Sequence, residues 1–185
     1  MELSQLSVTY DRENDRILTR FNTQEGHELR VWLTRRLLSR ANQPLLDAMV
    51  NQDARQSHLL SDDAASKRVV SAFRQSQSLE AADFKTPYNT QAKAYPLGTA
   101  PLLVTHLHIT AKAQGNLAIR FEEQLGTPPV SRSFQVALGP DMLHSFMHLL
   151  QAALKAADWG FDFDDQPAFL GDDPLLHTPG TGYLN

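Results

Sequence analysis

With 185 residues, 42% of them hydrophobic and 21% charged, the chain has the length and composition of one ordinary globular domain. The absence of cysteine excludes disulfides, thiol nucleophiles and cysteine-ligated metals. No apolar run approaches the ~18 residues of a membrane span. The first residues, Met1–Gln5, lack the basic start and apolar core of a signal peptide. We therefore expect one soluble cytoplasmic domain of 1–185, with no membrane partner.

The net charge of −4 is unevenly distributed along the chain. Residues 16–40 hold six arginines against two glutamates, a local charge of +4, whereas residues 158–185 hold six aspartates and no lysine or arginine. Two interpretations remain open. The segments neutralise each other within one fold, or the acidic segment masks the basic one until a partner displaces it.

Both halves of the chain show three strands followed by a helix. In the first half, 5–56, period-two alternation of apolar residues predicts three strands: 5–12, 16–23 and 28–33. Thr34 is suited to cap the helix that follows. Pro44 lies inside the helical pattern and removes a backbone donor, so we expect a kink or break near Asn42.

The second half, 102–159, repeats this order. Alternation and turn residues predict three further strands: 102–113, 117–124 and 131–138. Pro140 opens a strongly amphipathic helix, and Gly160 is expected to stop it. The segment 57–101 joins the halves as a linker helix from Ser61 to about Ala82 followed by a polar loop. An acidic segment, 160–185, ends the chain.

The predicted fold class is α+β: two pseudo-repeated β-β-β-α units with antiparallel sheet, each helix covering one face of a sheet, with a helical linker between them. Whether the halves form one sheet or two stays open. The layout resembles single-stranded nucleic-acid-binding folds of the PUR-repeat and Whirly type, which build each unit from four strands and a helix. The segment Arg30–Arg36 looks similar to uncharacterised bacterial proteins, a likeness that implies no function.

The outer face of the predicted sheet provides the candidate interaction surface. If Leu29 and Val31 point to the core, Arg30 and Trp32 point away from it. The whole candidate set is Arg20, Arg30, Trp32 and, through the repeat, Arg120. Arginine and tryptophan suit a protein contact, and they also suit bases and phosphates of single-stranded nucleic acid. Alternatively, the acidic segment or the linker helix covers Trp32.

Histidine is the one ligand type with suggestive spacing. The metal-site candidates are His106, His108, His144 and His148. The first two share a strand face and the last two share a helix face, which we expect to be the polar one. Because the two pairs face different directions, solvent-exposed histidines are the favoured interpretation.

The sequence favours a non-catalytic function through protein–protein contact, in a small protein that self-associates as a homodimer. No phosphate-binding loop or nucleophile motif occurs, so we predict no catalytic residue and no cofactor, and enzyme activity stays an open question. The first alternative is single-stranded nucleic-acid binding on the outer sheet face. The second is a metal-dependent enzyme that uses the four histidines.

Overall fold

The computed structural model describes residues 2–57, 63–127 and 130–161 and shows an α+β protein with two sheets. The elements follow one another as β1 (Leu3–Asp11), β2 (Arg16–Thr23), β3 (Glu28–Leu33), α1 (Arg35–Gln56), α2 (Ala64–Ala81), β4 (Leu102–Leu103), β5 (His106–Ala111), the short 3-10 turn η1 (Ala113–Gly115), β6 (Leu117–Leu125), β7 (Val130–Leu138) and α3 (Pro140–Ala157). Among the helices described, none is long and apolar enough to cross a membrane.

The strands form two separate sheets, and one short strand of the second half, β4, belongs to the first sheet. The first sheet has the order β1-β2-β3-β4, antiparallel except where β4 joins β3 in parallel, and the second has the order β5-β6-β7. The prediction of one strand over 102–113 is wrong, because the chain leaves the first sheet after β4 and enters the second at β5. Buried Val104 donates its backbone N–H to Trp32 of β3, and Thr105 donates to Glu122 of β6. This short segment therefore links the two sheets.

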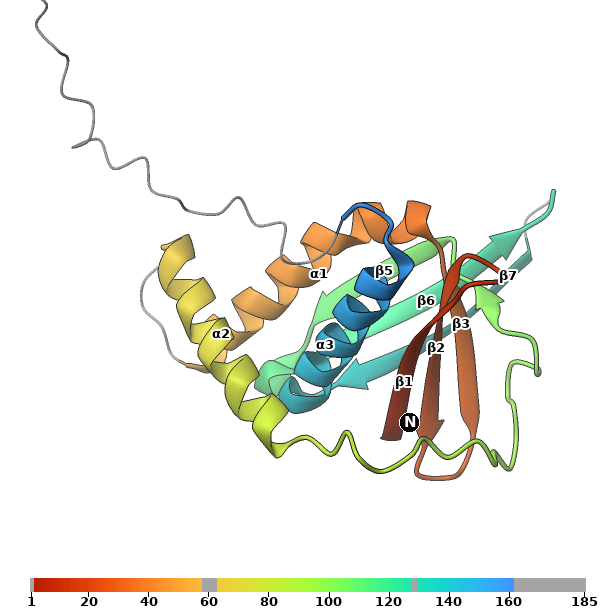
Figure 1. The fold of residues 1–185 in the computed structure, drawn as a ribbon, viewed down its shortest axis with the longest axis horizontal. Helices are drawn as coiled ribbons and strands as arrows, with labels where there is room; N and C mark the ends of the chain where they lie inside the picture. Colours follow the sequence, from red (N-terminus) through yellow and green to blue (C-terminus); the bar gives the residue numbers. More distant parts are fainter. Residues whose placement is uncertain (1, 58–62, 128–129, 162–185) are drawn as a thin grey trace, which may run out of the picture.

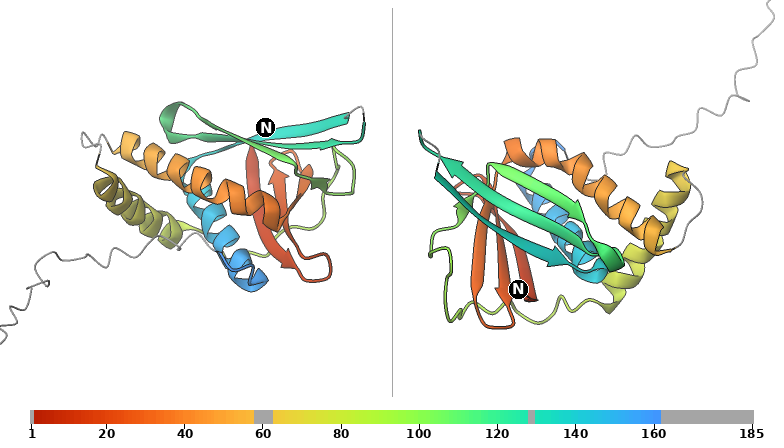
Figure 2. Two further views of the ribbon diagram at one scale, coloured as in Figure 1. Left: turned by 90° about the horizontal axis from the view of Figure 1, so that it is seen from above. Right: turned by 180° about the vertical axis from the view of Figure 1, so that it is seen from behind.

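Helices α1 and α3 each pack on the sheet of the opposite half (Figures 1 and 2). Helix α3, which follows the second sheet, lies along β1 of the first sheet. Helix α1, which follows the first sheet, lies along β5 and β6 of the second. The halves are thus interlocked, because the apolar face of each sheet is covered by a helix from the other half.

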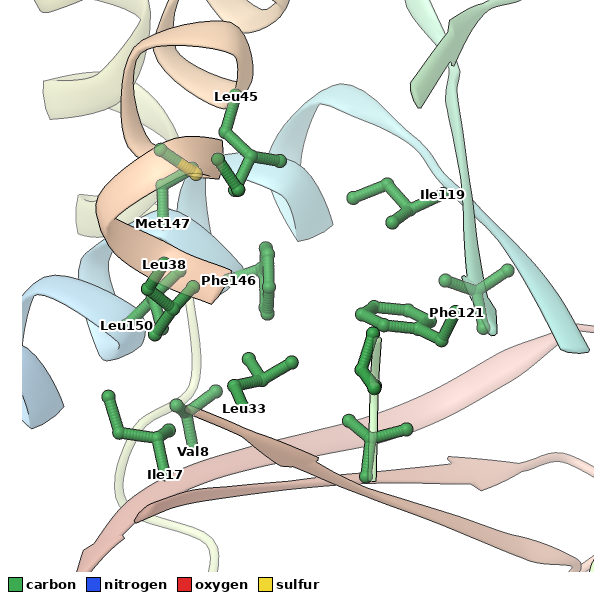
Figure 3. Close-up of a cluster of buried hydrophobic side chains, with 14 of the residues drawn as sticks. Val8, Ile17, Leu33, Leu38, Leu45, Ile119, Phe121, Phe146, Met147 and Leu150 are labelled. Atoms are coloured by element: carbon green, nitrogen blue, oxygen red, sulfur yellow. The ribbon is translucent and has the colours of Figure 1, made fainter. Parts of the chain in front are cut away.

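A single hydrophobic core joins both sheets with α1 and α3 (Figure 3). Buried side chains come from all of them: Val8, Ile17, Leu33, Leu38, Leu45, Ile119, Phe121, Phe146, Met147 and Leu150. Phe21 of β2 lies at the junction, with its ring centroid 5.4 Å from that of Phe121 and 6.4 Å from that of Phe146. The apolar residues that alternate along the strands and recur along α1 and α3 pack into this shared core.

Helix α1 begins where the sequence predicts and does not break. The Thr34 hydroxyl accepts the Leu37 backbone N–H at 3.2 Å, as an N-cap should. Of the expected kink or break near Asn42, the break is wrong, because α1 continues through Pro44 to Gln56. Pro44 lies on the exposed side, where the carbonyl that it deprives of a partner can bond to water.

Helix α3 begins with Pro140 in its first turn, as predicted, but Gly160 does not end it. Asp158 takes the left-handed C-cap position instead, with φ 50°, and its backbone N–H donates to Leu154 at 3.1 Å. Aspartate tolerates this backbone region better than most residues. The following Trp159 is buried and donates its indole N–H to Asp15 at 2.7 Å. The segment Trp159–Phe161 is therefore held beside the β1–β2 turn.

Candidate functional site

The polar loop after α2 lies across the outer face of the first sheet, and we call residues 83–101 the strap. The Asn22 side chain donates to the Asn89 carbonyl at 2.8 Å. The Glu28 backbone N–H donates to Ala94 at 3.0 Å. His27 and Ala94 form a parallel bridge. Side-chain and main-chain hydrogen bonds thus fix the strap to the sheet over a sequence separation of more than 60 residues.

Arg20 and Arg30, two of the predicted contact residues, lie beneath the strap. They are direct neighbours across β2 and β3, a like-charge pairing that is unfavourable on its own. The strap supplies an aromatic ring to each of them: Arg20 lies 4.4 Å from the ring centroid of Tyr88, and Arg30 lies 4.4 Å from that of Tyr95. These cation–π contacts stabilise the two charges inside the molecule.

Glu28 anchors the same arrangement from the first sheet. Its side chain is buried, it forms an ion pair with Arg30, and it accepts the Tyr88 hydroxyl at 3.2 Å. Burial and the nearby Glu28 carboxylate raise the pKa of Tyr88 well above its ordinary range. The guanidinium groups of Arg20 and Arg30 are therefore already engaged, and a ligand on this face would have to compete with the strap.

The raised pKa of Tyr88 gives a pH-dependence that can be measured. Its neutral form is favoured in the folded state, so the associated stability is complete below the ordinary tyrosine pKa of about 10 and is lost as pH rises through the raised pKa. In an alkaline titration of tyrosine ionisation, followed by phenolate absorbance, Tyr88 should ionise at the highest pH. We expect Tyr88→Phe to remove this highest-pH step. The matched variant Tyr95→Phe should leave that step in place, and the reverse result would contradict the assignment.

Trp32 and Arg120, the other predicted contact residues, lie on different sheets. Trp32 is half-buried on the outer face of the first sheet, opposite Leu18, with its main chain bonded to the segment after β4. Whether the acidic segment covers it lies outside the described residues. The strap, rather than the linker helix, covers the arginines beside it. Arg120 lies on β6 of the second sheet, opposite His108 of β5.

The outer face of the second sheet is exposed and carries both signs of charge. His108 lies opposite Arg120, and His106 lies opposite Glu122. The Glu122 carboxylate is 3.1 Å from the His108 ring nitrogen and 3.8 Å from the Arg120 guanidinium. Hydrogen bonds from Ser131 and His108 lower the pKa of Glu122. An anionic glutamate at the centre of this face weakens it as a phosphate-binding surface.

The four histidines do not converge. His106 and His108 are exposed on β5, and His148 is exposed on α3 with its ring 5.4 Å from that of Phe84. The expectation that His144 lies on a polar helix face is wrong, because it is 1% exposed. Across residues 2–57, 63–127 and 130–161, no three or more His, Asp or Glu side chains are grouped so as to hold a metal ion.

His144 belongs to a buried polar network that joins the three helices. Its Nε2 lies 3.2 Å from Oδ1 of Asp53 on α1, and the Ser71 hydroxyl of α2 donates to Oδ2 of the same carboxylate at 2.6 Å. All three side chains are buried. The order differs from that of a hydrolytic triad, because Ser71 bonds to the carboxylate and not to the imidazole that would take its proton. The arrangement positions helices rather than activating a nucleophile.

Helix α2 has its polar and apolar sides reversed. Its buried residues are Ser71 and Ser78, whereas Val69 and Phe73 are 70% and 63% exposed. The Ser78 hydroxyl donates to Asp141 of α3 at 2.7 Å, so the helix is held by hydroxyl–carboxylate bonds. Val69 and Phe73 are four residues apart, so they lie next to each other on the solvent side of α2.

A groove of about 650 Å³ lies beside these exposed side chains, between α2 and the start of α3. Val69, Val70, Phe73 and Pro140 give it an apolar lining. Its charged lining residues have partners already: Arg74 donates to Ser57 at 2.9 Å, and Asp141 accepts from Ser78. We call the exposed Val69 and Phe73 together with this groove the α2 face.

The α2 face was not among the predicted surfaces, because the helical pattern from Ser61 to about Ala82 was interpreted only as a linker. The available signal was the seven-residue spacing of Ser71 and Ser78 on the side opposite Val69 and Phe73. Comparison with known proteins adds no assignment: no family model, no curated protein and no solved structure matches the chain.

Proposed function

We propose that the protein acts non-catalytically through protein–protein contact and that it self-associates as a homodimer through the α2 face. The observation that carries the proposal is the reversed helix, which buries Ser71 and Ser78 and exposes Val69 and Phe73. Removing such side chains from water on association is favourable by roughly 25 cal/mol for each Å² of apolar surface.

A second copy of the chain is the partner that best fits this surface. An isologous dimer requires one patch that is complementary to itself. The α2 face offers a projecting ring, Phe73, next to a groove lined by Val70 and Pro140. Phe73 lies near the middle of Ala64–Ala81, so two antiparallel α2 helices would each place Phe73 near the groove of the other. The same pairing opposes the helix dipoles favourably.

Two finer statements belong to the same proposal. The two β-β-β-α units are repeats of one pattern, which the matching order of β1–β3 with α1 and β5–β7 with α3 supports. The protein works in the cytoplasm, which cell fractionation would test. Among residues 2–57, 63–127 and 130–161, no observation favours nucleic acid on the first sheet, where Tyr88 and Tyr95 already contact the arginines.

Substitution on the α2 face should abolish the dimer. We expect the unaltered protein to sediment as a dimer at micromolar concentration and Val69→Asp to sediment as a monomer, with at least a tenfold weaker Kd, about 1.4 kcal/mol. Phe73→Ser should have the same effect. Thermal unfolding of the variants at equal concentration would show that the monomer fold is retained.

Val130 offers a matched control for this experiment. It is the same residue type and is 69% exposed, almost the value for Val69, but it lies on β7. Val130→Asp should leave the dimer intact. A monomeric unaltered protein at tens of micromolar, or a dimer broken by Val130→Asp and not by Val69→Asp, would refute self-association through α2.

A further inference from the structure

Three exposed arginines, Arg35, Arg36 and Arg40, lie on the first turns of α1, and we call them the arginine cluster. Arg36 and Arg40 are four residues apart, so they lie next to each other on the solvent side of the helix. The first turn of α1 contains no acidic residue. Cations here oppose the positive end of the helix dipole and repel one another, so this position favours an anionic partner.

The described part of the chain does not provide that partner. Within residues 2–57, 63–127 and 130–161, no ion pair forms with any member of the arginine cluster. The charge of Arg35 makes a small contribution to the lowered pKa of Asp15. The main causes of that lowered pKa are hydrogen bonds from Trp159 and Tyr10. The positive charge of the cluster therefore remains largely unbalanced.

The residues at the end of the described part of the chain, Trp159–Phe161, lie beside this cluster. Trp159 bonds to Asp15 at the β1–β2 turn, and Phe161 stacks on Trp159 with ring centroids 6.4 Å apart. Figures 1 and 2 show this end of the chain next to the first turns of α1. Three of the next four residues are acidic: Asp162, Asp164 and Asp165. At about 3.3–3.6 Å per residue, these aspartates lie within roughly 15 Å of Phe161.

We propose that three aspartates of the acidic segment, Asp162, Asp164 and Asp165, dock on the arginine cluster of the same chain. The opposite charges and the short tether support this occupant over an external anion. A tether of a few residues gives an effective concentration in the millimolar range, so weak surface ion pairs suffice for binding. The contact links the acidic end of the chain to the start of α1. It is independent of the dimer proposed above.

A distance measurement on the full chain tests the docking. Because the protein has no cysteine, Ser39→Cys on α1 and Ala168→Cys beyond the aspartates provide two unique nitroxide-labelling sites. Spin–spin distances should be short and narrowly distributed at low salt. They should lengthen and broaden near 1 M salt, where the Debye length is about 3 Å. They should also lengthen when Arg35→Gln, Arg36→Gln and Arg40→Gln are combined.

Two matched variants separate docking from a general charge effect. Combining Lys85→Gln, Lys112→Gln and Arg120→Gln removes the same charge elsewhere and should leave the distance short. Asp172→Asn with Asp173→Asn should also leave it short, whereas Asp162→Asn, Asp164→Asn and Asp165→Asn together should lengthen it. An equally broad distribution in the unaltered chain and the arginine variant would overturn the proposal. A second result would also overturn it: the arginine cluster binds added polyphosphate, but the two labels show no short distance when polyphosphate is absent.

Discussion

Phe21→Ala is expected to lower the free energy of unfolding by about 3–5 kcal/mol, as large-to-small changes at buried phenylalanines do. The Phe21 side chain is fully buried, and its ring centroid lies 5.4 Å from that of Phe121, 6.0 Å from that of Phe134 and 6.4 Å from that of Phe146. These contacts join the first sheet to the second sheet and to α3. The total free energy of unfolding of a native protein is about 5–15 kcal/mol, so the expected loss is a large fraction of it.

Urea unfolding of the variant and the unaltered protein, followed by circular dichroism, measures this loss. The exposed Phe84, 46% accessible, provides the control of the same chemistry. Phe84→Ala should cost less than about 1 kcal/mol, as surface substitutions do. Equal effects of Phe21→Ala and Phe84→Ala would mean that the sheets are not joined through Phe21.

Asp53→Ala is expected to destabilise the protein by about 2–6 kcal/mol, because it leaves two buried polar groups without the carboxylate that they contact. The Ser71 hydroxyl and His144 Nε2 would both stay buried after losing the carboxylate that they contact. Each such polar group costs about 1–3 kcal/mol. The loss is expected first at α2, which has Ser71 and Ser78 as its only two buried residues.

Hydrogen exchange resolves where that loss occurs. Amides of α2 should exchange faster in Asp53→Ala under conditions in which the sheets remain protected, because weakly packed elements open locally. Asp53→Asn keeps one acceptor oxygen and should cost less, and Ser71→Ala should cost about 1 kcal/mol. Uniform acceleration across the sheets, with α2 no faster than the rest, would show that the network does not specifically hold α2.

Local pattern allowed most of the elements to be predicted. Period-two alternation located five of the six expected strands, and Thr34 and Pro140 marked the starts of α1 and α3 correctly. The errors came from tertiary competition. Continuous alternation over 102–113 cannot show that its first residues pair with β3 and its later ones with β6. The packing of α1 similarly outweighs the propensity of Pro44 to interrupt it.

The candidate site was less predictable, because side-chain partners distant in sequence define it. A helical wheel places His144 with polar neighbours, but Asp53, 91 residues away, makes its burial tolerable. Arg20 and Arg30 point away from the core as predicted. Their tyrosine partners come from a loop more than 60 residues later, with no regular pattern of its own. Sequence periodicity describes one face of one element and does not identify what covers it.

The exchange of helices between the halves has a consequence for how the chain acquires its structure. A fragment ending at α1 would contain β1–β3 of the first sheet without β4, and without α3, the helix that lies along β1. A fragment starting at β4 would contain the second sheet without α1. Neither half can bury its apolar surface alone, so the protein should fold in one cooperative transition that awaits synthesis of α3. Pairing such distant segments raises the contact order, which slows folding.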